Sequence, residues 1–125
     1  MPLKSLKILI IDDEKVICDF LAKLFSVWGI EAYVCSNGYQ AVEAVRENRF
    51  DAAFIDWRMQ GMDGAETLHM LKEICPAIKG VIMTGYPRED VLRDLDVAKF
   101  KGDVIIKPFD IGKIRELVDK FALNK

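Results

Sequence analysis

The chain has 125 residues, of which 51% are hydrophobic and 30% are charged, and its formal net charge is −2. A single domain of this length can bury a core without metal or disulfide support. The chain has no basic run and no apolar stretch long enough to span a bilayer, so we expect no direct nucleic-acid contact and no membrane insertion.

The first apolar run and the pattern after it predict a strand followed by a helix. The run Ile8–Ile11 is typical of a buried strand. Apolar residues then recur at spacings of three and four as far as Trp28, which predicts a helix. Asp12 or Asp13 can cap the start of this helix, and Gly29 is typical of its end.

The middle of the chain repeats this alternation twice. A short strand is expected at 32–35, and the turn 36–38 leads into a helix with apolar residues over 41–45. The run 52–55 predicts the third strand. A loop with two glycines follows it, and Pro76 ends the next helix.

Two further strands, at 81–83 and 104–106, each lead into a helix. The first of these helices has apolar residues over 91–95, and the second has them over 111–121. Five strands and five helices in strict alternation predict one α/β domain over residues 1–125, with a doubly wound parallel sheet covered on both faces. The periodicity does not determine the strand order.

Reactive polar side chains follow four of the five expected strands. These residues are Asp12 and Asp13 after the first strand, Asp56 after the third, Thr84 after the fourth and Lys107 after the fifth. The carboxyl ends of parallel strands share one edge, where open α/β folds place their sites. Three carboxylates there would repel one another without a cation, and Mg²⁺ prefers such oxygen ligands. One carboxylate could attack phosphorus, while Thr84 and Lys107 bind phosphoryl oxygens.

Each of these residues also has a purely structural interpretation. Asp12 and Asp13 can cap a helix, Thr84 can be a strand-end hydroxyl, and Lys107 can be a solvated charge. Pro108 restricts the backbone of Lys107 to extended geometry, which involves no chemistry. The presence of such groups at four strand ends is what favours a functional site.

Five short motifs together resemble the receiver domain of bacterial two-component response regulators. The motifs are Ile11–Glu14, Phe54–Met59, Gly61–Gly64, Met83–Gly85 and Lys107–Phe109, within a match that runs from Lys7 to about Leu123. The resemblance implies a flavodoxin-like fold with strand order 2-1-3-4-5. It also implies a cytoplasmic phosphoacceptor switch in a phosphorelay. A cytoplasmic location agrees with the cysteines, which are three in number and lack metal-type spacing, and with the lack of a signal-peptide segment.

The resemblance implies roles for individual residues. Asp56 would accept a phosphoryl group from a histidine kinase or a phosphotransfer protein. Mg²⁺ would be held by Asp12, Asp13, Asp56 and the backbone carbonyl of Arg58. Asp13 would be the direct metal ligand, and Asp12 would act through water.

Further positions would modulate the switch. Thr84 and Lys107 match the switch hydroxyl and the characteristic lysine of the family. Arg58 and Tyr86 are bulky residues at the positions that flank the path of the hydrolytic water, which predicts slow phosphate loss. Val104 stands where the family usually has a tyrosine or phenylalanine, so we expect that aromatic switch to be absent or relocated to Tyr86.

Two other classes of protein remain as alternatives. A small phosphatase with an aspartate nucleophile would commonly have a second aspartate where this chain has Arg58. A flavin-binding redox domain would need a phosphate-binding loop, and the acidic segment Asp12–Glu14 would repel a phosphate without a metal. For the switch, the downstream partner would be a protein target or an attached output domain, and a phosphorylation-dependent dimer is left open.

Overall fold

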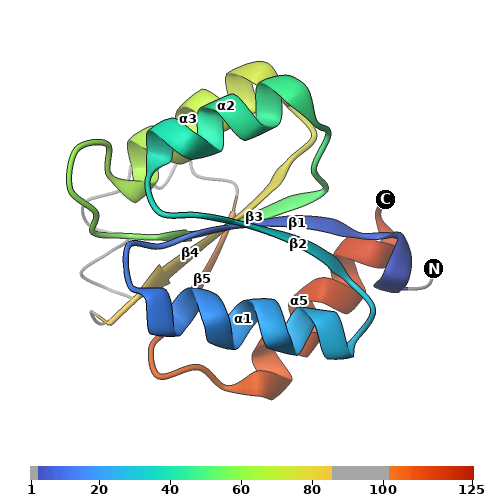
Figure 1. Ribbon diagram of the computed structural model, residues 1–125. Helices are drawn as coiled ribbons and strands as arrows, with labels where there is room; N and C mark the ends of the chain where they lie inside the picture. Colours follow the sequence, from blue (N-terminus) through green and yellow to red (C-terminus); the bar gives the residue numbers. More distant parts are fainter. Residues whose placement is uncertain (1–2, 86–101) are drawn as a thin grey trace.

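The computed structural model describes residues 3–85 and 102–125, which form one α/β domain (Figure 1). None of the helices in these two ranges is both long enough and apolar enough to cross a membrane. The elements are a 3₁₀ helix η1 (Leu3–Ser5), β1 (Lys7–Ile11), α1 (Lys15–Val27), β2 (Glu31–Cys35), α2 (Gly38–Glu47), β3 (Ala52–Asp56), α3 (Gly64–Ile74), β4 (Lys79–Thr84), β5 (Asp103–Ile106) and α5 (Ile111–Leu123).

The five strands form one parallel sheet in the order β2-β1-β3-β4-β5. This confirms both the α/β class and the strand order that the family resemblance implies. The described residues contain four α-helices, whereas five were predicted. The remaining predicted helix, over 91–95, lies outside the described residues.

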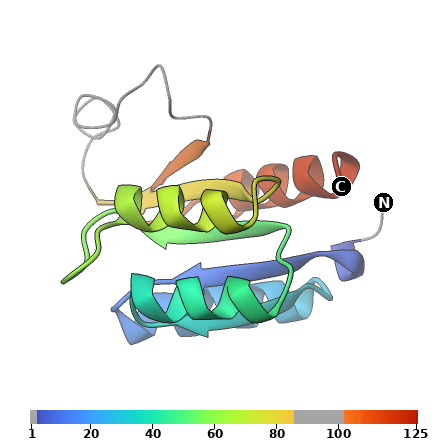
Figure 2. The same cartoon turned by 90° about the horizontal axis from the view of Figure 1, so that it is seen from above.

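The helices cover both faces of the sheet, with α2 and α3 on one side and α1 and α5 on the other (Figure 1), and Figure 2 looks down on the side of α2 and α3. Side chains of β1 alternate between these two layers. Leu9 and Ile11 belong to the core cluster under α2 and α3, and Ile8 and Ile10 belong to the cluster under α1 and α5. Because both faces are covered, the central strands β1 and β3 have unbroken apolar runs, Ile8–Ile11 and Ala52–Ile55, that end at the carboxyl edge.

The ends of α1 and α3 agree only in part with the sequence prediction. Gly29, with a φ of 78°, follows α1, and Pro76 follows α3, both as predicted. The capping of α1 by Asp12 or Asp13 was wrong, because its N-cap residue is Glu14, whose side chain makes no capping bond. Asp12 Oδ1 instead accepts a hydrogen bond from the Glu14 amide at 2.9 Å, which fixes this carboxylate at the sheet edge.

Candidate functional site

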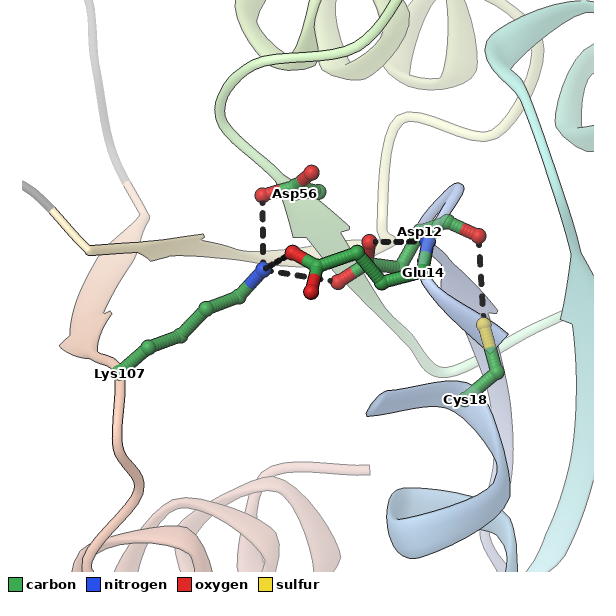
Figure 3. A network of polar contacts seen from close by, with 5 residues as sticks. All are labelled: Asp12, Glu14, Cys18, Asp56 and Lys107. Atoms are coloured by element: carbon green, nitrogen blue, oxygen red, sulfur yellow. Dashed lines mark hydrogen bonds and ion pairs between the residues drawn. The ribbon is translucent and has the colours of Figure 1, made fainter. Parts of the chain in front are cut away.

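Three of the predicted polar residues, Asp12, Asp56 and Lys107, meet at the carboxyl edge of the sheet (Figure 3). Asp12 follows β1 and Asp56 ends β3, and these two strands are neighbours paired in register. One carboxylate oxygen from each of Asp12, Asp13 and Asp56 lies within 4.8 Å of the others. The sheet therefore assembles the three acids that the sequence placed after two different strands.

Lys107, just after β5, reaches across the edge and joins these acids. Its Nζ donates to Asp12 Oδ2 at 3.0 Å, to Asp56 Oδ1 at 3.1 Å and to Glu14 Oε1 at 3.3 Å. The Asp12, Asp56 and Lys107 side chains are only 0%, 9% and 16% exposed. Solvent screens such contacts weakly, so the charges at this edge act strongly on one another.

The charges of this cluster are not balanced. Burial and the neighbouring Asp12 raise the pKa of Asp56 to about 6, although Lys107 acts in the opposite direction. Burial by itself would lower the pKa of Lys107, but the hydrogen bonds to Asp12 and Asp56 outweigh it and raise that pKa. Several carboxylates share a single ammonium group. Their oxygen atoms fit a hard divalent cation such as Mg²⁺, which takes oxygen ligands and offsets this excess of negative charge.

Thr84 and Lys107 lie side by side at the carboxyl ends of the neighbouring strands β4 and β5. Thr84 is the last residue of β4 and is 1% exposed. Its carbonyl oxygen accepts a hydrogen bond from the Lys107 amide at 2.7 Å. The Lys107–Pro108 peptide bond is cis. Val104, which stands in β5 where the family usually has an aromatic ring, is partly buried and packs against the core cluster under α2 and α3.

Of the two bulky residues predicted to shield the site, Arg58 lies within the described residues and Tyr86 does not. The Arg58 side chain is exposed and its guanidinium lies 5.6 Å from the centre of the Trp57 ring. Tyr86 lies outside the described residues. The slow loss of phosphate that these residues would cause therefore stays a prediction.

Glu14, Cys18 and Gly64 also shape this site, although the sequence did not predict this role for them. Glu14 binds Lys107, and Cys18 Sγ donates to the Asp12 carbonyl at 3.3 Å. A Cβ at Gly64 would lie 2.5 Å from the carbonyl oxygen of Asp56, so the first residue of α3 must be glycine. The acidic run Asp12–Glu14 could have indicated Glu14, and the spacing of the glycines at 61 and 64 could have indicated Gly64. No sequence pattern indicated Cys18.

Similarity to known proteins agrees with the resemblance seen in the sequence motifs. Residues 8–119 match the family described as the response regulator receiver domain. The chain is 37% identical over 117 residues to sporulation initiation phosphotransferase F of Bacillus subtilis, covering 92% of both proteins. It is 38% identical over 113 residues to the transcriptional regulatory protein ZraR of Klebsiella oxytoca, covering 90% of this chain but 25% of that protein.

The structure is also similar to the receiver domain of the sensor histidine kinase PA1611 from Pseudomonas aeruginosa. The TM-score is 0.81 at 19% sequence identity, and the match covers 93% of this chain and 96% of that one. That protein was crystallised with a magnesium ion coordinated in its active-site cleft. At this identity the likeness supports the fold alone.

Proposed function

The chain belongs to the response regulator receiver domain family, and from this premise we propose that Asp56 is its phosphoacceptor. Receiver domains are phosphoacceptor signalling switches of two-component systems, and they interact with histidine kinases or phosphotransfer proteins and with output domains. The observation that carries the assignment is the position of the Asp56 carboxylate. It is largely buried at the end of β3, 3.1 Å from Lys107 Nζ and within reach of two further acids.

In the proposed reaction, a carboxylate oxygen of Asp56 attacks the phosphorus of a phosphohistidine on the upstream partner. The new P–O bond forms as the P–N bond breaks, and the imidazole nitrogen keeps the electron pair. Lys107 would bind one phosphoryl oxygen and the Thr84 hydroxyl another, which offsets charge on the transferred group. A pKa of about 6 leaves most of Asp56 ionised and able to attack at neutral pH.

Asp12, Asp13, Asp56 and the backbone carbonyl of Arg58 would hold Mg²⁺, with Asp13 as a direct ligand and Asp12 acting through water. The close approach of the three carboxylates supports this assignment. A bound Mg²⁺ would supply the positive charge needed before a phosphoryl group can enter among three acids.

We further propose that the chain assists its own phosphorylation and dephosphorylation and turns over no other substrate. Arg58 occupies the position where an aspartate phosphatase would commonly place its acid/base carboxylate, so we do not propose that activity. The domain would act in the cytoplasm, in keeping with its three free cysteines. Its output would be a protein target or an attached domain, without direct nucleic-acid contact.

Metal-dependent labelling tests the function directly. Incubation with acetyl phosphate and Mg²⁺ should add one acid-labile phosphoryl group, detected by intact mass, because this small donor can transfer a phosphoryl group without a kinase, with acetate as the leaving group. With EDTA in place of Mg²⁺ the added mass should disappear. Equal labelling under both conditions would contradict the need for a cation at this edge.

Thr84→Ala should uncouple phosphorylation from the conformational response. The variant keeps Asp56 and Lys107, so it should still accept a phosphoryl group. It lacks the hydroxyl that would move toward the phosphoryl oxygen, so amide chemical-shift changes in β4, β5 and α5 on adding beryllium fluoride and Mg²⁺ should shrink. Thr84→Ser is the matched control and should respond as the wild type does. A full response in Thr84→Ala would refute the role.

A further inference from the structure

We propose that Cys18 is a positioning residue for the metal site, an inference that rests on the proposed function. Cys18 is 4% exposed in the first turn of α1, and its thiol points toward the site loop (Figure 3). Sγ donates to the carbonyl oxygen of Asp12 at 3.3 Å, and the Cys18 amide donates to the carbonyl oxygen of Glu14 at 3.2 Å. One residue therefore holds the backbone on both sides of Asp13, the acid proposed to contact the metal directly.

The thiol completes a set of contacts that fixes Asp12 at each of its polar groups. The Asp12 amide donates to the Cys35 carbonyl at 3.2 Å, and the two carboxylate oxygens accept from the Glu14 amide and from Lys107 Nζ. The remaining group, the Asp12 carbonyl, accepts the Cys18 thiol. The Asp12 side chain and the backbone on both sides of Asp13 are thus held in place before a metal binds, which lowers the entropy lost on binding.

The Cys18 contact differs from the Lys107 contact in one functional respect. Lys107 would turn toward a phosphoryl oxygen when the site is phosphorylated, so its hydrogen bond to Asp12 Oδ2 is available only part of the time. The Cys18 thiol binds the backbone carbonyl of Asp12, whereas Lys107 binds the Asp12 carboxylate. In the described network the thiol does not contact Lys107 or Asp56. Cys18 can therefore keep the loop in place in both states of the switch.

The test compares Mg²⁺ affinity in Cys18→Ala, which loses the donor, and Cys18→Ser, which keeps one. Trp57 directly follows Asp56, so intrinsic fluorescence can follow a Mg²⁺ titration. Cys18→Ala should raise the Mg²⁺ dissociation constant about two- to tenfold, the range expected for losing one hydrogen bond. Cys18→Ser should stay within about twofold of wild type. Cys75→Ala, which removes the partly buried cysteine near Phe50, should leave the affinity unchanged.

Additional measurements separate positioning from a general effect on stability. At saturating Mg²⁺, Cys18→Ala should reach the wild-type extent of phosphorylation by acetyl phosphate, because only the metal requirement has changed. A variant that is less stable in urea but binds Mg²⁺ as tightly as wild type would overturn the proposal. Equal weakening in Cys18→Ser and Cys18→Ala would also overturn it, since side-chain volume would then explain the effect.

Failure of the underlying function gives a different result. If wild type and Asp13→Asn bind Mg²⁺ with the same affinity, the proposed metal site itself is wrong, and the role of Cys18 falls with it. If Asp13→Asn weakens Mg²⁺ binding and Cys18→Ala does not, the metal site stands and only the positioning role is refuted.

Discussion

Asp56→Asn is expected to abolish phosphoryl transfer to the chain. Asparagine has nearly the same shape and can still accept a hydrogen bond from Lys107, so the fold should persist, but its amide is not a nucleophile toward phosphorus. Intact mass after incubation with acetyl phosphate and Mg²⁺ should show no added phosphoryl group, and a phosphorylated histidine kinase should likewise fail to transfer one. Circular dichroism should match that of wild type.

The matched control for this loss is Asp119→Asn. Asp119 is an exposed residue of α5 that pairs with Arg115, so neutralising it removes one carboxylate without altering the sheet edge. It should be labelled to the same extent as wild type. Undiminished labelling of Asp56→Asn would show that another residue accepts the phosphoryl group.

Asp56→Asn should also stabilise the metal-free protein at neutral pH. The folded state holds the pKa of Asp56 at about 6, against an ordinary value of 3.8, because burial and Asp12 disfavour its charged form. One pKa unit corresponds to about 1.4 kcal/mol, so removing this charge should raise the unfolding free energy by at most about 3 kcal/mol. The pKa of about 6 already includes the opposing effect of Lys107, which lowers the pKa of Asp56.

The sign of the effect sets its pH window. Below the ordinary value of 3.8, Asp56 is protonated in both the folded and unfolded states and has no effect. As pH rises toward about 6, the unfolded state releases its proton more readily than the folded state, so wild-type stability falls. The gain from Asp56→Asn should therefore be small near pH 4 and complete above pH 6.

Urea denaturation in EDTA at several pH values, with Asp119→Asn as the control, measures this gain. Added Mg²⁺ should then stabilise wild type more than Asp56→Asn, because the variant lacks one proposed ligand. Equal or lower stability of the variant at neutral pH would mean that the ion pair between Asp56 and Lys107 outweighs the repulsion among the acids.

The location of the site could be predicted from the sequence because burial on both sheet faces leaves few places for polar groups. In central parallel strands, the first polar residue after an apolar run must lie at the carboxyl edge, and Asp12, Asp56 and Thr84 all do so. The same periodicity is compatible with several strand orders, and only the motif resemblance distinguished them. The neighbouring positions of β1 and β3, which bring Asp12 beside Asp56, therefore depended on that resemblance.

The finer contacts of the site depend on geometry that the periodicity of strands and helices does not encode. Asp12 could be assigned to helix capping because acids commonly do this, yet its carboxylate binds the Glu14 amide and Lys107 instead. The thiol of Cys18 reaches a carbonyl six residues earlier only because α1 starts close beside β1. The requirement for Gly64 arises from the close approach of its backbone to Asp56.

Chemical trapping of the acceptor tests the central claim most directly. Borohydride reduces an aspartyl phosphate to homoserine, so peptide mass spectrometry can locate the residue that carried the phosphoryl group. After reaction with acetyl phosphate and Mg²⁺, homoserine should be found at position 56, and it should be absent when EDTA replaces Mg²⁺. Homoserine at another aspartate, or an equal yield at position 56 without a divalent cation, would contradict a metal-dependent phosphoacceptor at Asp56.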